Sequence, residues 1–231
     1  MIRLVNIKKT LGDARNSFAL RIEDLRVETP GVYALIGANG SGKSTAAKIM
    51  AGILKPDSGR VETALDPKEI TMVTQKPYIM DDSVFNNIAY PLRLRGLRGA
   101  DDIDRPCDEW LEKIGLLSRK NQNARGLSGG EKQKLALARA MVFSPRLLIL
   151  DEAMTDLDLD AVELFAQAMR DFQARAPAAW ILISHHLAQV RRLCESFFFM
   201  SGGSLCAQGP IAELSRCEAP DLRRYLRSEA P

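Results

Sequence analysis

The sequence predicts an α/β protein with a mostly parallel sheet, and three observations support that fold class. Four short apolar runs have the length and the aliphatic or β-branched content of buried parallel strands. Each run ends abruptly at a polar residue or a glycine, and amphipathic helical patterns separate the runs. Strands that alternate with helices are typical of a doubly wound sheet. The runs are residues 32–36, 70–74, 147–150 and 180–183.

The first part of the chain departs from this pattern. Residues 3–8 and 18–27 alternate apolar and polar side chains, and turn residues stand between them at 12–13. This alternation predicts a small antiparallel sheet within residues 1–29. The first parallel strand follows, and then a helix whose apolar face is expected to carry Ala46, Ile49, Met50 and Ile53.

Two later regions have helical spacing. Residues 83–124 contain no convincing buried strand, so we expect a helical insertion there. A second helix lies between the last two parallel strands, and residues 187–194 and 197–208 predict a further helix and a strand pair. The apolar positions are Cys107, Trp110, Leu111, Ile114 and Leu117 in the insertion, and Val162, Phe165, Met169, Phe172 and Ala176 in the second helix.

Composition and charge exclude several classes of protein. The 231 residues are 46% hydrophobic and 26% charged, which is ordinary for a globular domain. No apolar stretch approaches the ~18 residues of a membrane-spanning helix, and the start alternates like a strand, so we expect neither a span nor a secretion signal. The net charge of +3 does not indicate a nucleic-acid partner. The four cysteines form no Cys-x-x-Cys pair, so a zinc site is not indicated.

A glycine-rich stretch directly follows the strand at residues 32–36 and precedes a helix, and it fits the pattern G-x-x-x-x-G-K-[ST]. Glycines let the backbone wrap closely around a phosphate, whose charge the amide groups and the helix N-terminus face. Lys43 can reach the β and γ oxygens, and Ser44 can ligate Mg²⁺. The residues predicted to bind nucleotide phosphate are Gly37, Ala38, Asn39, Gly40, Ser41, Gly42, Lys43, Ser44 and Thr45.

Two adjacent carboxylates, Asp151 and Glu152, end the strand at residues 147–150. Burying carboxylates is costly unless a cation or hydrogen bonds compensate, and Mg²⁺ bound with the nucleotide would supply the cation. Asp151 is therefore expected to hold the metal, directly or through water. Glu152 is expected to polarise the water that attacks the γ-phosphate.

A second glycine-containing helix start lies at residues 127–131, ahead of a helix predicted over 132–142. It has the features of another anion-binding helix N-terminus. The phosphate loop already accounts for one nucleotide in this chain. The second helix start therefore suggests contact with a nucleotide held elsewhere, as in a shared dimer site. Ser128 and Glu131 also fit a purely structural capping box, and the residues alone leave both interpretations open.

Together these motifs resemble the ATP-binding cassette (ABC) ATPase family, and the match covers nearly the whole chain. The signature is Leu127-Ser128-Gly129-Gly130-Glu131, between the phosphate loop and Asp151. Gln75 matches the family's Q-loop, residues 155–158 match its D-loop, and His185 matches its switch histidine. His186 is an adjacent competitor, but His185 follows the strand more directly.

The resemblance implies a P-loop NTPase (RecA-like) core with a parallel sheet, a small N-terminal antiparallel β subdomain and an inserted α-helical subdomain. It implies one ABC ATPase domain over residues 1–231. Within that domain, residues 1–29 are the mainly antiparallel part, residues 30–82 and 143–231 form the core, and residues 83–142 form the helical subdomain with the signature.

The resemblance also implies a homodimer that encloses each ATP between the phosphate loop of one copy and the signature of the other. ATP and Mg²⁺ are the implied cofactors. Glu152 would be the general base and His185 would touch the γ-phosphate. The other implied roles are metal contact by Ser44, Gln75 and Asp151, contact with the partner copy's ATP by Ser128, Gly129, Gly130 and Glu131, and communication across the dimer by Asp158.

Two departures from the family pattern stand out. The family commonly has an aromatic residue for adenine stacking near position 11, where this chain has Leu11, and Phe18 is the nearby substitute. Because stacking on an aromatic side chain favours base binding, we expect weak discrimination between ATP and GTP. Ala153 also replaces the proline that usually follows the catalytic glutamate, which alters the turn without removing Glu152.

The resemblance implies an ATPase subunit that powers transport from the cytoplasmic face of the cell membrane. Its partners would be separate transmembrane permease subunits, which dock on the helical region, and a solute-binding protein. Residues 75–90 resemble importers of oxyanions, tungstate first, with molybdate or phosphate next. A cassette ATPase of a non-transport complex, such as a cell-division or mechanical signalling assembly, stays open as the alternative.

Overall fold

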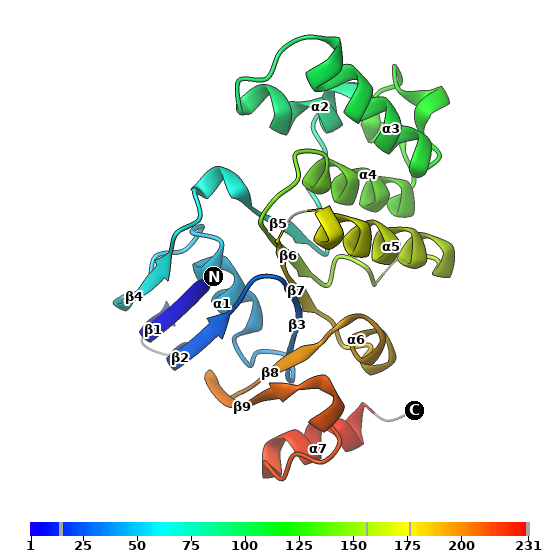
Figure 1. Cartoon of the computed structure of the whole chain (residues 1–231). Helices are drawn as coiled ribbons and strands as arrows, with labels where there is room; N and C mark the ends of the chain where they lie inside the picture. The colour runs from blue at the N-terminus through cyan, green and yellow to red at the C-terminus, as the bar shows by residue number, and fades with distance from the viewer. Residues whose placement is uncertain (14–15, 156, 176, 230–231) are drawn as a thin grey trace. The chain divides into compact units, whose positions relative to one another are not determined.

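The structure is a computed structural model, and it describes residues 1–13, 16–155, 157–175 and 177–229 (Figure 1). Within these ranges no helix has both the length and the apolar character needed to span a membrane. The chain divides into two compact units, which are described in turn. The first comprises Met1–Met72, Arg146–Glu152 and Pro177–Pro231, and the second comprises Val73–Pro145 and Ala153–Ala176.

In the described part of the chain, the strands form one nine-stranded mixed sheet. Their bounds are β1 Ile2–Asp13, β2 Asn16–Val27, β3 Gly31–Ile36, β4 Ser58–Thr63, β5 Ile70–Thr74, β6 Leu147–Asp151, β7 Ala179–Ile183, β8 Ser196–Ser201 and β9 Ser204–Pro210. The order is β4-β1-β2-β9-β8-β3-β7-β6-β5. Strands β8, β3, β7 and β6 are parallel neighbours, whereas β1 pairs antiparallel with both β2 and β4. The predicted fold class, a parallel core with an antiparallel N-terminal part, is therefore confirmed. Strand β4 had not been predicted.

Seven α-helices accompany the sheet within the described residues. The first unit contains α1 Lys43–Met50, α6 Leu187–Leu193 and α7 Pro220–Ser228. The second contains α2 Val84–Leu94, α3 Arg105–Lys113, α4 Gly129–Met141 and α5 Leu159–Arg175. The region expected to be a helical insertion thus holds α2, α3 and α4, which contact one another.

Helix α1 packs into the core of the first unit, but it is shorter than predicted. Ala46, Ile49 and Met50 are buried in this core with the inward side chains of the sheet. Ile53 is 66% exposed, so its assignment to the buried face was wrong. The helix ends because Gly52 adopts φ 72 and its N–H bonds to the carbonyl oxygen of Ile49 at 3.1 Å.

The second unit has its own core around α5. Phe165 and Met169 are buried, and the ring of Phe165 stacks on Trp110 of α3 with 6.3 Å between centroids. Val162 and Phe172 are half-buried, and Ala176 lies outside the described residues. Helix α4 begins at Gly129, three residues before its predicted start, because Ser128 provides the N-cap.

Candidate functional site

The loop between β3 and α1 contains backbone conformations that glycine adopts without strain and other residues rarely adopt. Gly37, Gly40 and Gly42 have φ values of 146°, 76° and 102°. A Cβ atom on Gly37 would lie 2.1 Å from the carbonyl oxygen of Met200, and one on Gly42 would lie 2.8 Å from Leu20. The loop therefore passes so close to β8 and β2 that any side chain at these two positions would collide. This is the close backbone wrapping that a phosphate cradle requires.

Lys43 lies at the start of α1 and is only 6% exposed. Its Nζ donates to the carbonyl oxygens of Gly37 at 2.7 Å and Ala38 at 3.0 Å. Burial lowers the pKa of Lys43, and the nearby carboxylates of Glu152 and Asp151 oppose that shift. The lysine is thus held inside the loop, next to where a bound phosphate would add negative charge.

The other loop residues differ in exposure. Ala38, Asn39 and Gly40 are exposed, and Thr45 is half-buried. Ser41 is buried, and its hydroxyl oxygen has no hydrogen-bonding partner among the described residues. An orphaned buried hydroxyl inside a loop of this shape fits a site that binds a polar ligand.

Ser44 and Asp151 come together from α1 and β6. The Ser44 hydroxyl donates to Oδ1 of Asp151 at 3.1 Å. Burial raises the pKa of Asp151, while the hydrogen bond from Ser44 partly opposes the shift. A hydroxyl and a carboxylate are hard oxygen donors of the kind that Mg²⁺ prefers, so this pair fits the predicted metal.

Glu152 and His185 also meet in the first unit. Nε2 of His185 and Oε1 of Glu152 are in direct contact. The backbone N–H of Glu152 bonds to the carbonyl oxygen of Ile183 at 3.0 Å, and Glu152 has φ 54. His186 is exposed and forms the N-cap of α6. Of the two adjacent histidines, His185 is therefore the one beside the carboxylate.

The second glycine motif begins α4 in the second unit. The Ser128 hydroxyl accepts from the Glu131 N–H at 3.3 Å, and the Glu131 carboxylate accepts from the Ser128 N–H at 2.8 Å, which completes a capping box. Arg119 donates to the other carboxylate oxygen at 2.6 Å. The capping box is thus present, yet Ser128 and Gly129 stay exposed, so the helix N-terminus is open to an anion.

Gln75 and Asp158 also belong to the second unit. Gln75 is exposed directly after β5. Asp158 is exposed, accepts from the Ala161 N–H at 2.7 Å and pairs with Lys134 at 3.1 Å. The hydrogen bond from Ala161 lowers the pKa of Asp158, so the carboxylate stays charged. Of the predicted D-loop, Asp156 lies outside the described residues.

Leu11 and Phe18 are cross-strand partners in the β1–β2 hairpin. A Cβ atom on Gly42 would lie 2.9 Å from Cζ of Phe18, so the Phe18 ring packs against the phosphate loop. Leu11 remains half-buried in β1. The aromatic side chain beside the loop is therefore Phe18, the substitute that the sequence offered.

Sequence reasoning did not connect helix α7 with this site. Its Tyr225 packs against Phe199 of β8, the strand beside the loop, with 5.6 Å between ring centroids. No local motif marks this residue, because the contact depends on strand order and joins segments far apart in the chain.

Comparison with known proteins agrees with this geometry. The model of the family described as ABC transporter matches residues 20–155. The tungstate uptake system ATP-binding protein TupC of Peptoclostridium acidaminophilum is 36% identical over 87% of this chain and 95% of its own length. The methionine import ATP-binding protein MetN 1 of Pseudomonas fluorescens is 31% identical over 99% of this chain and 73% of its own length.

A solved structure described as the ATP-binding subunit of an ABC transporter has the same fold. It superposes with a TM-score of 0.86, covers 99% of both chains and shares 23% sequence identity. The fold implied by the motifs, a P-loop NTPase core, is thereby confirmed. The matched family model and the 36% identical relative carry the identification further: this chain belongs to the ABC transporter family.

Proposed function

We propose that this chain hydrolyses ATP with Mg²⁺ and thereby powers import of a solute, tungstate, through separate membrane-spanning subunits. One observation supports the proposed ATP hydrolysis most directly. In the first unit, the glycine cradle with buried Lys43, the Ser44–Asp151 pair and the Glu152–His185 pair gather at the ends of neighbouring parallel strands. Such strand ends are where α/β sheets bind ligands.

Each group has a separate task in phosphate chemistry. Lys43 and the loop amides bind the phosphate charge, and Ser44 and Asp151 supply oxygen ligands for the metal. Mg²⁺, when bound, neutralises negative charge that develops on the phosphate oxygens. These residues bind and orient the nucleotide, which is the larger part of catalysis in phosphoryl transfer.

Glu152 is the general base in this proposal. Its carboxylate accepts a proton from water as the water attacks the γ-phosphate. His185, in contact with Oε1, holds that carboxylate in position and reaches toward the γ-phosphate. The general base contributes typically 10²–10⁴-fold to the rate of such a reaction.

The second unit supplies residues for a neighbouring copy. We assign the exposed start of α4, with Ser128, Gly129, Gly130 and Glu131, to the ATP held by a second copy of this chain. The helix N-terminus favours negative charge, and Arg119 already neutralises the Glu131 carboxylate. In the same proposal Gln75 contacts the metal, Asp158 communicates across the dimer, and both units belong to one ABC ATPase domain.

Four large apolar side chains between residues 78 and 97 are exposed, and they support the proposed membrane partner. Large apolar residues are seldom exposed in a group unless they meet a partner. Tyr78 is 75% exposed and Leu94 is 65% exposed, and both lie in the second unit. Tyr90 and Leu97 continue this stretch of the chain. We propose that these residues dock the transmembrane subunits and so hold the chain at the cytoplasmic face of the membrane.

Tungstate is proposed as the solute because TupC is the relative with the higher identity of the two described above, 36% against 31% for the methionine import protein. In this proposal the site binds and hydrolyses ATP, and it does not determine which solute is transported. That choice is assigned to the membrane subunits and to a solute-binding protein.

The decisive experiment reconstitutes the chain with its membrane subunits in liposomes and adds the solute-binding protein. We expect ATP hydrolysis to rise when that protein is loaded with tungstate, and to stay at the basal rate with methionine. Stimulation by methionine alone would replace tungstate with the solute of the second relative. Association with a division or signalling complex, without any solute dependence, would contradict transport altogether.

A further inference from the structure

The segment over residues 78–82 carries an exposed aromatic side chain on irregular backbone. Tyr78 is 75% exposed, and these five residues, all of them described, contain neither helix nor strand. The segment belongs to the second unit and precedes α2 in the chain. Its backbone has no helix or strand partners, so the position of the Tyr78 ring depends on hydrogen bonds from side chains of neighbouring elements.

Arg139 of α4 reaches the backbone of this segment. Its Nη2 donates to the carbonyl oxygen of Tyr78 at 2.6 Å, and its Nη1 donates to Oδ1 of Asn87 at 3.3 Å. Arg139 is half-buried and burial lowers its pKa, but an arginine stays charged in proteins. Hydrogen bonds from a charged donor are about twice as strong as neutral ones. A strong bond from α4 therefore holds the Tyr78 peptide.

Asn87 of α2 holds the middle of the same segment. It is completely buried, and its Oδ1 accepts from the Met80 N–H at 3.0 Å. Its Nδ2 donates to the carbonyl oxygens of Met80 at 3.2 Å and Ser83 at 3.0 Å. Because the same Oδ1 atom accepts from Arg139, the two side chains form one network. Polar networks whose hydrogen bonds are made in this way rigidify the structure around them.

The far end of the segment is held separately. Asp81 forms an ion pair with Arg125 at 3.0 Å and accepts from Nδ2 of Asn123 at 2.9 Å. These contacts act on a residue that lies further along the chain. At Tyr78 itself, the backbone contact comes from Arg139.

We propose that Arg139 is a positioning residue, which fixes the backbone at Tyr78 and so presents the exposed ring to the transmembrane subunits in its bound position. Tyrosine is enriched among the side chains that contribute most to binding at protein interfaces. A side chain whose backbone is already ordered loses less conformational entropy on binding, which strengthens the complex. The inference rests on the proposed docking of these subunits at Tyr78, and it is independent of which solute is transported.

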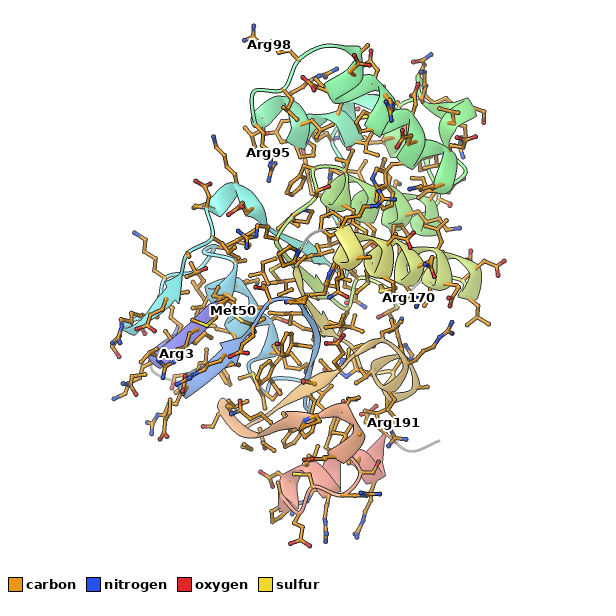
Figure 2. The ribbon with its side chains drawn as sticks, viewed as in Figure 1. Arg3, Met50, Arg95, Arg98, Arg170 and Arg191 are labelled. Carbon is orange, nitrogen blue, oxygen red and sulfur yellow. The ribbon has the colours of Figure 1, made fainter. Side chains whose placement is uncertain are left out.

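Arg139→Lys and Tyr78→Ala test this role, and Arg170→Lys is the matched control. Lysine keeps the positive charge but lacks the planar fork of donors, so it cannot bond to both acceptors of Arg139 in the same geometry. Figure 2 shows Arg170 on α5 of the same unit, where its guanidinium donates to Glu163 at 2.9 Å and to Gln167 at 2.7 Å. Both of these partners lie on α5 itself. The control therefore replaces an arginine that also bonds to two side-chain or backbone acceptors, but outside the Tyr78 segment.

The measurement is the dissociation constant between the chain and the purified transmembrane subunits in nanodiscs, by surface plasmon resonance. We expect Tyr78→Ala to weaken binding by roughly thirtyfold or more, and Arg139→Lys to weaken it by roughly two- to tenfold. Because Arg139 acts through Tyr78, the double variant should bind no more weakly than Tyr78→Ala alone. Arg170→Lys should bind like the wild type.

Two further measurements separate positioning from damage to the fold. The unfolding midpoint of each variant is determined first, and all affinities are compared well below the lowest midpoint. The affinity for a non-hydrolysable ATP analogue, measured by calorimetry, should be the same in Arg139→Lys and in the wild type. That site lies in the first unit, whereas Arg139 lies in the second.

Wild-type docking affinity in Arg139→Lys would overturn the inference, and so would an equal loss in Arg170→Lys. Fully additive losses in the double variant would also overturn it, because Arg139 would then act independently of the ring. A matching loss of ATP-analogue affinity in Arg139→Lys would indicate general damage and reject the positioning role. By contrast, wild-type affinity in Tyr78→Ala would contradict the proposed docking at Tyr78, and this result is recognised without any change at Arg139.

Discussion

Glu152 and His185 are in side-chain contact at the ends of two neighbouring strands, β6 and β7. These strands are parallel, with Asp151 opposite Ile183, so the residues after them emerge at the same edge of the sheet. Glu152 has φ 54, which is uncommon for a residue with a Cβ atom, and such conformations cluster at functional sites. The contact places a proton acceptor beside a side chain that can orient it.

Glu152→Gln should abolish most ATP hydrolysis and leave ATP binding intact. The amide has the same shape but cannot accept the proton from water, so we expect the turnover number to fall by about 10²–10⁴-fold. With ATP bound and not consumed, the dimer should accumulate. Steady-state phosphate release and size-exclusion chromatography with ATP measure the two effects.

Glu23→Gln is the control, because Glu23 is an exposed carboxylate on β2 in the same unit. It should hydrolyse ATP at the wild-type rate. Unchanged hydrolysis in Glu152→Gln would remove Glu152 as the general base.

Lys43→Ala should lose affinity for nucleotide. The variant removes a charged donor from a buried position, and hydrogen bonds to charged groups contribute about 1.5–3 kcal/mol each. We expect ATP binding to weaken at least tenfold, measured by calorimetric titration. Lys48→Ala alters an exposed lysine on the same helix and should bind ATP like the wild type. Equal losses in both variants would point to damage to α1 and against a phosphate contact.

Asp151→Asn should stabilise the chain when no nucleotide is present. Burial raises the pKa of Asp151 above its ordinary value of 3.8. The folded protein therefore binds the proton more tightly than the unfolded chain, and wild-type stability falls as the pH rises through the raised pKa. Asp151→Asn has no carboxylate to ionise at this position, so its stability does not fall in this way. Its advantage should be absent below about pH 3.8 and present at neutral pH, as a rise of a few degrees in the unfolding midpoint.

The same variant should need more Mg²⁺ for hydrolysis, because an amide is a weaker metal ligand than a carboxylate. A magnesium titration of the ATPase rate measures this. A variant that is less stable than the wild type at neutral pH would show that the Asp151 charge is well compensated in the folded chain.

Because position 11 holds leucine and not an aromatic residue, we predict that the chain discriminates only weakly between adenine and guanine nucleotides. Dissociation constants for ATP and GTP should lie within about tenfold of one another, since no aromatic ring stands at position 11. Leu11→Tyr should tighten binding of both nucleotides by up to the ~1–3 kcal/mol of base stacking. Competition calorimetry with the two nucleotides tests this. A strong ATP preference in the wild type would assign base selection to another side chain, with Phe18 as the first candidate.

Much of the fold could be predicted because its signals are local. The parallel strands are apolar runs of four or five residues, and the phosphate loop is one contiguous motif that stands between a strand and a helix. The prediction failed in two places, for different reasons. Ile53 continued the apolar spacing of α1, yet Gly52 in a left-handed conformation ended the helix and left that side chain in solvent. Strand β4 is short, polar and at the edge of the sheet, so its sequence carries almost no strand pattern.

The chemistry that we predict for this chain is encoded in short, contiguous segments of its sequence. Gly37, Gly42 and Lys43 predict a phosphate loop because backbone conformation and side-chain type are set within a few neighbouring residues. Which distant groups meet depends instead on long-range packing. Glu152 reaches His185 because β6 and β7 are adjacent in the sheet, and Tyr225 reaches Phe199 because α7 packs on β8, the neighbour of β3. Strand order is a property of the whole core, since it depends on which buried faces pack best together, and no single segment encodes it.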